Sequence, residues 1–433
     1  MKHQIAIAGA AALLAAMTAA AQGDGWRAPA DVVARLSQQP GFNYDESRVG
    51  AYTLPDVLGA GPAAVRTPGQ WRARRAEILD LFRENVYGRS PGKPDHLDFS
   101  TLEENTRAMD GAATLRRVSI KSRQGDRTHE FELLLFVPNA ALRPEASRAP
   151  VPVFLLINNR PATNTDPTRK EKSGFWPAEQ MIARGYGIAA IQYGQLAPDD
   201  KDRYRDGAMT LFDGAASAGP GPTWGAIAAW AWGASRALDY LVTDARVDNA
   251  RVGIVGHSRG GKAALWAGAE DERFAMVVSN ESGEGGAALS RRWFGETVER
   301  INTSFPHWFT AKYKSFNGRE ASLPIDQHML LALTAPRALY VASADEDLWS
   351  DPRGEFLSLV ETSPVFALWG EPPLAASQMP ALDRPLIVGR RGYHIRTGAH
   401  NLTPYDWDRI ADFADRVWPR PRRDKRPDGG NGR

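Results

Sequence analysis

Cysteine is absent from the 433 residues of the chain. Its absence excludes disulfide bonds, a lipid-anchored cysteine and metal sites built from thiolates. A His-Glu-x-x-His pattern is also missing, so we expect neither a metal nor a cofactor. Charge of one sign is not in excess, because 53 Lys and Arg residues face 51 Asp and Glu residues. This near balance does not indicate a nucleic-acid partner, and stability must come from a hydrophobic core.

The N-terminal residues have the layout of a secretory signal peptide. Lys2 and His3 precede the mostly apolar run 5–20, and small residues surround the bond after Ala21. An uncleaved membrane anchor is the alternative, but the run is short and rich in alanine, so its tendency to enter a bilayer is weak. We therefore expect residues 1–21 to be a signal peptide. The mature protein is expected to be bacterial, periplasmic or secreted, and free of the membrane.

Short apolar runs typical of strands alternate with helical patterns from about residue 113 onwards. The run Val151–Ile157 is almost unbroken, as expected of a central strand that is buried on both faces. Alternation of this kind predicts an α/β protein, a three-layer αβα sandwich around a mostly parallel sheet. Further strands are expected at 115–120, 131–137, 187–192, 252–255, 276–279, 338–342 and 385–389, and helices at 177–184, 224–242, 262–269 and 405–418.

The same patterns suggest a division of the chain. Residues 22–110 are expected to form an N-terminal layer that packs on a catalytic domain of residues 111–418, with a helix over 70–87. The stretch 283–324 interrupts the alternation, and we expect it to be an insertion over the carboxyl edge of the sheet, where ligands bind in open α/β folds. Basic residues, Pro and Gly crowd 419–433, which predicts a disordered tail.

The strongest chemical signal is a Gly-x-Ser-x-Gly motif centred on Ser258. The apolar run Val252–Val255 leads into it and an alanine-rich helix follows, which is the layout of a nucleophile elbow. We interpret Ser258 as the nucleophile of a serine hydrolase. A phosphate-binding loop is an alternative reading of the same glycines, but it requires Ser or Thr where the chain has Ala263. A chance match in a surface turn is the other alternative.

A serine nucleophile needs a base, and the chain order of this class of site places a histidine after the last strand. His400 lies in a predicted loop directly before the closing helix, which is the expected position. His394 falls in a predicted strand and His328 in a predicted helix, so both are interpreted as structural.

Two carboxylates are candidates for the acid that orients the histidine. Asp347 follows the predicted strand 338–342, and Glu281 follows the strand after the elbow helix. Either could hold the imidazole in one tautomer and stabilise its charged form. A surface or capping role is the alternative for each. We expect the two to share the work.

A set of longer motifs resembles the glucuronoyl esterases of carbohydrate esterase family 15, particularly their bacterial branch. The resemblance covers about residues 151–418, and the residues that carry it are Gly256-His257-Ser258-Arg259-Gly260-Gly261-Lys262, Asn280-Glu281-Ser282-Gly283-Glu284-Gly285-Gly286, Arg291-Arg292-Trp293-Phe294-Gly295-Glu296-Thr297, Phe305-Pro306-His307-Trp308-Phe309 and Asp345-Glu346-Asp347-Leu348-Trp349. It implies an α/β-hydrolase fold and cleavage of an ester between 4-O-methyl-glucuronic acid of xylan and a lignin alcohol.

The resemblance also implies roles for individual residues. Ser258 matches the nucleophile and His400 the base, while Glu281 matches the acid of fungal members and Asp347 an acid seen in bacterial members. Arg259 matches an arginine that helps to stabilise the oxyanion. The residues that match those holding the uronate sugar are Lys262, Glu296 and Trp349. One departure is visible, because His257 stands where fungal members carry a cysteine that is paired in a disulfide.

Alternatives to each of these roles remain. Lys262 could be a solvated helix lysine, and Trp349 could belong to the core. An acetyl xylan esterase, or another carbohydrate or aryl esterase, would need no uronate-holding set. A non-catalytic carbohydrate-binding protein is the alternative of another class. The expected partner is glucuronoxylan or a lignin–carbohydrate ester, with no nucleic acid, and we expect a monomer.

Overall fold

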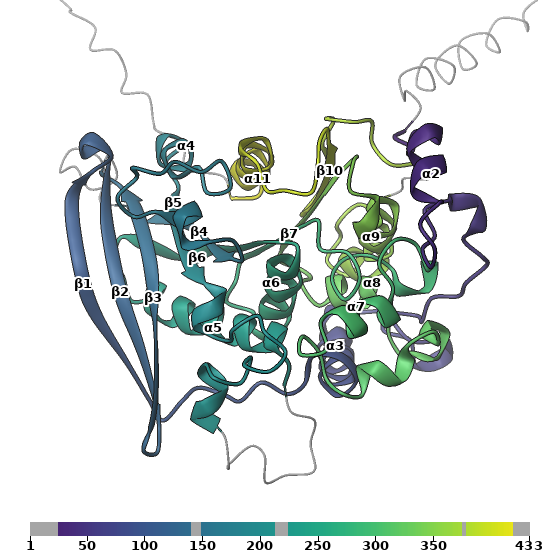
Figure 1. Cartoon of the computed structure of the whole chain (residues 1–433), viewed down its shortest axis with the longest axis horizontal. Helices are drawn as coiled ribbons and strands as arrows, with labels where there is room; N and C mark the ends of the chain where they lie inside the picture. Colours follow the sequence, from purple (N-terminus) through teal and green to yellow (C-terminus); the bar gives the residue numbers. More distant parts are fainter. Residues whose placement is uncertain (1–24, 140–148, 213–223, 375–377, 419–433) are drawn as a thin grey trace, which may run out of the picture.

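A ten-stranded sheet organises the computed structural model, which describes residues 25–139, 149–212, 224–374 and 378–418 (Figure 1). The predicted signal peptide at 1–21 and the predicted tail at 419–433 lie outside the described residues. The strands are β1 (His96–Ala108), β2 (Ala113–Gln124), β3 (Arg127–Pro138), β4 (Val151–Asn158), β5 (Gly187–Gln192), β6 (Val247–His257), β7 (Met276–Asn280), β8 (Ala338–Ala344), β9 (Leu386–Val388) and β10 (Arg391–Arg396).

Helices separate the strands of the second half of the chain, which explains the alternation seen in the sequence. They are α2 (Ala30–Leu36), α3 (Pro68–Phe82), α4 (Ala178–Ala183), α5 (Ala226–Leu241), α6 (Arg259–Glu270), α7 (Val298–Ser304), α8 (Gln327–Ala332), α9 (Pro352–Val360), α10 (Ser363–Ala367) and α11 (Pro404–Val417). The predicted helix over 70–87 is α3 together with one π-helical turn at Arg83–Tyr87.

The strand order is β1-β2-β3-β5-β4-β6-β7-β8-β10-β9. Neighbours from β5 to β10 along this order pair in parallel, whereas β1, β2, β3 and β9 join antiparallel at the two sides. The parallel part is buried on both faces, as the apolar runs predict. Because the parallel strands end at one edge, the loops that follow β4 to β8 and β10 gather there.

Two hydrophobic cores cover the two faces of the sheet. On one face α4 and α11 contribute Met181, Ile182, Trp407 and Ile410 to a core with Phe154 and Leu156 of β4. On the other, α3, α5, α6, α8 and α9 pack over Val153, Leu155 and Ile157 of the same strand. Figure 1 shows α4 and α11 above the sheet and α5 and α6 below it. The predicted three-layer αβα sandwich is therefore confirmed.

Strand β1 lies within the residues that the sequence analysis assigns to the N-terminal layer, and no pattern predicted it. It pairs with β2 from His96↔Arg123 to Ala108↔Ala113, as the edge of the sheet. Most of its side chains are exposed, so its sequence is polar and lacks the apolar run that indicates an inner strand.

The stretch 283–324 lies between β7 and β8. It contains α7 and several short 3₁₀ turns, with no strand among its residues. Nearer the N-terminus, Tyr44 forms a small hydrophobic cluster with Phe294 and Leu348. Backbone bonding ties the same regions together, because Gly295 N–H donates to the Asn43 carbonyl at 2.8 Å.

Among the described residues, no helix combines the length and the apolar character that a membrane span requires.

Candidate active site

Ser258 lies on a sharp turn between β6 and α6. Its backbone has φ 56° and ψ −124°, a region that non-glycine residues rarely adopt. The turn is held because Ser258 N–H donates to the Asn280 carbonyl at 2.9 Å, and the Ser258 carbonyl accepts from Gly261 and Lys262 N–H. Strain of this kind costs about 1–3 kcal/mol and persists where the surrounding structure enforces it. The turn keeps the serine half-buried at the carboxyl edge of the sheet.

The glycines beside Ser258 are explained by crowding. A Cβ on Gly256 would lie 2.0 Å from the Gly260 carbonyl oxygen, closer than any real contact. A Cβ on Gly260 would lie 3.0 Å from the Ile157 carbonyl oxygen. The Gly-x-Ser-x-Gly motif is therefore required by close backbone approach, as expected of a nucleophile elbow.

Strand register aligns the loops that carry the other candidate residues. His257 pairs with Asn280, and Asn280 with Ala342, so β6 and β7 end at the same level and β8 ends two residues further on. The bonding continues beyond the strands, because Glu281 N–H donates to the Ala342 carbonyl at 2.7 Å and Asp345 N–H to the Arg396 carbonyl at 3.0 Å. The structure thus brings residues that are more than a hundred positions apart in sequence to one edge.

His400 lies at this edge, and both candidate acids reach the same nitrogen of its ring. Nδ1 is 2.6 Å from Asp347 Oδ2 and 3.1 Å from Glu281 Oε2. Its other ring contact is with His257, at 4.4 Å between centroids, which places it beside the elbow. Within the described ranges no hydrogen bond joins the Ser258 hydroxyl to His400. Such bonds commonly tighten only when substrate is bound.

The electrostatics of His400 follow from these two carboxylates. Burial by itself would lower the pKa of His400, but the hydrogen bonds to Asp347 and Glu281 raise it to about 9. Burial raises the pKa of Glu281 to about 7. The arrangement stabilises an imidazolium, which is the charged state that a base passes through when it takes a proton from serine.

Glu281 has further partners that fix its position. Oε1 accepts from Arg396 Nη2 at 2.8 Å, and Oε2 accepts from Asn401 N–H at 3.0 Å. Arg396 also forms a pair of bonds with the buried carboxylate of Asp406, at the start of α11. The loop of His400 is therefore tied to both β7 and the closing helix.

His257 is a buried neutral imidazole. Burial, with the neighbouring charge of His400, holds its pKa well below the usual value. Nε2 lies 3.3 Å from Arg160 Nη2, and because a guanidinium can only donate, Nε2 must accept. Nδ1 therefore carries the proton and donates to Asn280 Oδ1 at 2.6 Å.

The competing histidines lie outside this arrangement. His394 is fully buried, with Nε2 2.8 Å from Asp406 Oδ1 and Nδ1 2.9 Å from the Tyr340 hydroxyl. His328 lies on α8 with Nε2 3.0 Å from the Pro55 carbonyl. Both bonding patterns agree with the structural interpretation.

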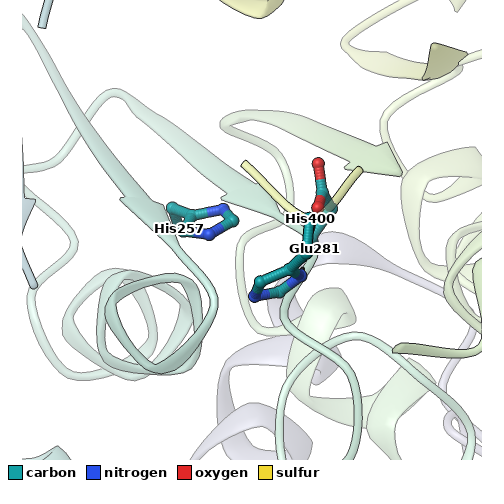
Figure 2. A group of neighbouring side chains, drawn as sticks. All are labelled: His257, Glu281 and His400. Atoms are coloured by element: carbon teal, nitrogen blue, oxygen red, sulfur yellow. Dashed lines mark ion pairs between the residues drawn. The ribbon is translucent and has the colours of Figure 1, made fainter. Parts of the chain in front are cut away.

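His257, Glu281 and His400 also meet the spacing of a cation site, since one ligand atom from each lies within 4.8 Å of the others (Figure 2). Both nitrogens of His257 and Nδ1 of His400 are already hydrogen-bonded. The guanidinium groups of Arg160 and Arg396 contact this group, and their charge opposes a cation. A hydrogen-bonded acid–base network explains the three residues better than a metal site does.

Arg259 is the first residue of α6 and projects over aromatic rings. Its guanidinium carbon lies 4.8 Å from the centroid of Trp308 and 5.3 Å from that of Phe305. Nη1 donates to the carboxylate of Asp199. The backbone N–H of Arg259 follows the nucleophile directly, which is the usual place of an oxyanion donor.

The three predicted sugar-holding residues come from separate segments that meet in the structure. Lys262, on α6, is buried and donates to the Ser282 carbonyl, with Nζ also 3.4 Å from Glu296 Oε2. The backbone N–H of Glu296 donates to the Trp349 carbonyl at 2.9 Å. Trp349 is half-buried, and its ring centroid lies 5.2 Å from that of Phe42, with the ring planes 63° apart. Lys262 is therefore not a solvated helix lysine.

Sequence reasoning missed several residues that build this site. Asp199, Arg396 and Phe42 contact predicted site residues, yet each lies in a segment without a recognisable motif. A buried acid in a polar loop resembles any surface acid in a single sequence, so no local signal would have found Asp199.

Comparisons with known proteins were made with this geometry in hand. A family model described as "Glucuronyl esterase, fungi" matches residues 143–370. Carbohydrate esterase MZ0003, of an unknown prokaryotic organism, is 40% identical over 419 residues, 90% of this chain and 94% of that protein. The structure of a glucuronoyl esterase from Solibacter usitatus has a TM-score of 0.79 and 42% identity, and the match covers 86% of this chain and all of that one.

A third relative carries a broader description. A structure titled as a promiscuous CE15 esterase from a marine bacterial metagenome has a TM-score of 0.75 and 39% identity. The match covers 87% of this chain and 99% of that chain.

Proposed function

The chain belongs to the glucuronoyl esterases, carbohydrate esterase family 15, with their α/β-hydrolase fold, and from this premise we propose that Ser258 opens the ester by forming an acyl-enzyme. Family membership makes the protein a carboxylic-ester hydrolase. The proposed substrate is the ester between (4-O-methyl-)glucuronic acid of glucuronoxylan and a lignin alcohol. The observation that carries the proposal is the meeting of Asp347 and Glu281 at Nδ1 of His400, beside the elbow of Ser258.

The first half of the proposed reaction forms the acyl-enzyme. His400 Nε2 takes the proton of the Ser258 hydroxyl as Oγ attacks the C6 carbonyl carbon of the uronate. The oxyanion that develops is stabilised by the backbone N–H and the guanidinium of Arg259, and one such donor is worth about 3 kcal/mol. When the intermediate collapses, the bond to the alcohol oxygen breaks and His400 returns the proton to that oxygen.

The second half releases the acid. Water loses a proton to His400 and attacks the acyl carbon, the bond to Ser258 Oγ breaks, and the serine regains the proton. Throughout both halves Asp347 and Glu281 hold Nδ1–H, so that Nε2 faces the reacting atoms.

The sugar is proposed to be held by Lys262, Glu296 and Trp349. Burial raises the pKa of the Glu296 carboxyl, while Lys262 opposes this by lowering it. The pair offers an acceptor and a donor to the hydroxyl groups of a pyranose, and Trp349 offers a ring face. Phe42 packs against Trp349 and restrains the orientation of the indole.

Hydrolysis of benzyl glucuronate tests the proposal, with acetylated xylan as the parallel substrate. We expect glucuronic acid to be released by the wild-type protein and not by Ser258→Ala. Glucuronate release by Ser258→Ala would contradict the acyl-enzyme. Binding of xylan without turnover by the wild-type protein would favour a carbohydrate-binding role instead.

A broader esterase is the second candidate, favoured by the relative whose title calls it promiscuous. Glu296→Gln separates the two candidates. If the uronate site sets specificity, the variant raises KM for benzyl glucuronate and leaves 4-nitrophenyl acetate hydrolysis unchanged. Equal effects on both substrates, or acetate release from xylan with no glucuronate cleavage, would reject the proposed sugar-holding role.

The location and the assembly state stay predictions. We propose that the protein acts in the periplasm or outside the cell as a monomer, because its proposed substrate is a plant cell-wall polymer. N-terminal sequencing of the exported protein tests removal of residues 1–21, and sedimentation of the purified protein tests the monomer.

A further inference from the structure

We propose that Asp199 is the positioning residue of the oxyanion arginine, because its carboxylate holds the Arg259 guanidinium and also the indole on which that guanidinium lies. The inference rests on the role given to Arg259 in the proposed function. Asp199 follows β5 in a loop that no motif of the sequence marks. It touches neither the candidate triad nor the residues proposed to hold the sugar, so its effect would pass through Arg259.

Both oxygens of Asp199 are occupied by donors. Oδ1 accepts from His307 Nε2 at 2.8 Å and from Trp308 Nε1 at 2.7 Å. Oδ2 accepts from Arg259 Nη1 and, at 3.3 Å, from the Tyr193 hydroxyl. Burial alone would raise the pKa of Asp199, but these hydrogen bonds and the charge of Arg259 lower it to about 2. The group is therefore a permanent anion at any working pH.

The same carboxylate orients the aromatic support of the guanidinium. Trp308 is buried, its N–H is bound to Asp199, and its ring stacks on Phe305 with centroids 3.7 Å apart and planes 3° apart. Arg259 lies over both rings, so its head is bounded by a carboxylate and by aromatic faces. Arginine stacks in this way because its guanidinium is planar and weakly hydrated.

Without this support the arginine would be poorly placed. Arg259 occupies the first turn of α6, where the helix dipole repels a cation, and its side chain is 29% exposed. A free guanidinium there would turn towards water. Fixed charge near a developing oxyanion accelerates reactions because no reorientation is needed at the moment of reaction. Asp199 therefore holds the Arg259 guanidinium in place before the reaction. Its negative charge also weakens part of the positive field that Arg259 exerts on the oxyanion.

The negative charge of Asp199 also has an opposing effect, because it partly neutralises the charge of Arg259. If Asp199 only neutralised Arg259, its removal would strengthen the positive field and raise kcat. The isosteric change Asp199→Asn decides between these effects. An asparagine oxygen can still accept from the indole and imidazole N–H groups, whereas the charge that attracts the guanidinium is lost.

The experiment is a double-mutant cycle on benzyl glucuronate with Asp199→Asn, Arg259→Ala and the double variant. Titration of Ser258 with a fluorophosphonate counts the functional sites, so kcat refers to folded protein. We expect kcat to fall about thirtyfold in Asp199→Asn and about a hundredfold in Arg259→Ala, with KM nearly constant. The double variant should equal Arg259→Ala, because Asp199 acts only through the arginine. Asp199→Ser provides the same cycle if the asparagine variant accumulates poorly.

Asp200→Asn is the matched control. Asp200 is the neighbouring acid on the same loop, exposed, and bonded only to the local backbone, so this variant should keep wild-type kcat. Unchanged or increased kcat in Asp199→Asn would overturn the inference. So would independent, multiplying losses in the double variant, which indicate a structural role. If Arg259→Ala itself kept full activity, the oxyanion role within the proposed function would fail instead.

Discussion

The loops after β7 and β8 each bring a carboxylate to the same imidazole nitrogen, but they hold it differently. Glu281 is 1% exposed, adopts φ 48° and shares its charge with the Arg396 guanidinium. Asp347 is 6% exposed, and its oxygen Oδ2 is bound only to the Ser350 hydroxyl and to His400. A carboxylate that is already paired with a guanidinium stabilises a neighbouring imidazolium less, because the guanidinium charge opposes that of the imidazolium. The comparison indicates that Asp347 is the stronger partner of His400 and Glu281 its support.

Removing both carboxylates should have the largest effect on activity. In Asp347→Asn/Glu281→Gln we expect kcat on benzyl glucuronate to fall about ten-thousandfold, because nothing then fixes the tautomer of His400 or stabilises its charge. The measurement is steady-state hydrolysis with sites counted by fluorophosphonate titration. A loss below about tenfold would show that neither residue acts as the acid of the triad.

The single variants measure the separate contributions of Asp347 and Glu281 to kcat. We expect Asp347→Asn to lose about a hundredfold in kcat and Glu281→Gln about tenfold, since each leaves one carboxylate on Nδ1. Glu346→Gln, which changes an exposed acid in the same loop as Asp347, is the matched control and should behave as wild type. If one single variant lost as much as the double variant while the other lost nothing, the acid would be a single residue.

The pH dependence of kcat/KM gives a smaller but more specific difference. The neutral imidazole of His400 is the proposed base, and the carboxylates raise the pKa of His400 to about 9, so activity should rise with pH towards that value. Loss of a carboxylate lowers this pKa, and the acidic limb of the profile should move to lower pH. The displacement should be larger in Asp347→Asn than in Glu281→Gln. Equal profiles in all three proteins would contradict the assignment.

The last difference concerns stability and not activity, and it comes from Glu355 on α9, which hydrogen-bonds to the segments that carry both candidate acids. Its Oε1 accepts from Ser282 and Gly283 N–H after β7, and its Oε2 accepts from the Ser343 hydroxyl of β8. Burial raises the pKa of Glu355 to about 8, against an ordinary value of 4.5. Between these values the folded state binds more protons than the unfolded state, so stability falls as pH rises.

Glu355→Gln removes this titration and should keep the bonding. We expect the unfolding free energy of the variant, relative to that of wild type, to rise by about 4 kcal/mol between pH 5 and pH 9. Thermal denaturation followed by circular dichroism across this range is the measurement. A variant that is less stable at both pH values would show that the carboxyl group itself is needed.

Local patterns in the sequence are sufficient for the apolar inner strands and for the elbow. The buried parallel strands β4 and β5 are almost entirely apolar and are therefore visible as runs, and the strained turn at Ser258 requires Gly256. The edge strand β1 was not predicted, because an exposed strand does not need an apolar run. The region after each strand could likewise be predicted as the location of site residues, since parallel strands end together.

Partnerships between distant residues could not be predicted. Arg396 holds Glu281 across 115 positions, and Asp199 holds Arg259 across 60. Neither pair can be recognised from local composition, because the role of such a charge depends on the residues that surround it in space. His257 illustrates the same limit: its burial and its tautomer depend on Asn280 and Arg160, which no motif links to it.

The main-chain bonds between the acid loop and the base loop have a consequence for turnover. Asp345 N–H donates to the Arg396 carbonyl, Glu346 N–H to the Gly398 carbonyl, and Gly398 N–H to Asp345 Oδ1. A histidine on a free loop would lose conformational entropy each time it met the serine, about 1–2 kcal/mol for every residue that becomes ordered. Here that loss occurs once, when the chain folds. If His400 is the base, as proposed, every later catalytic cycle starts from a base that is already immobilised.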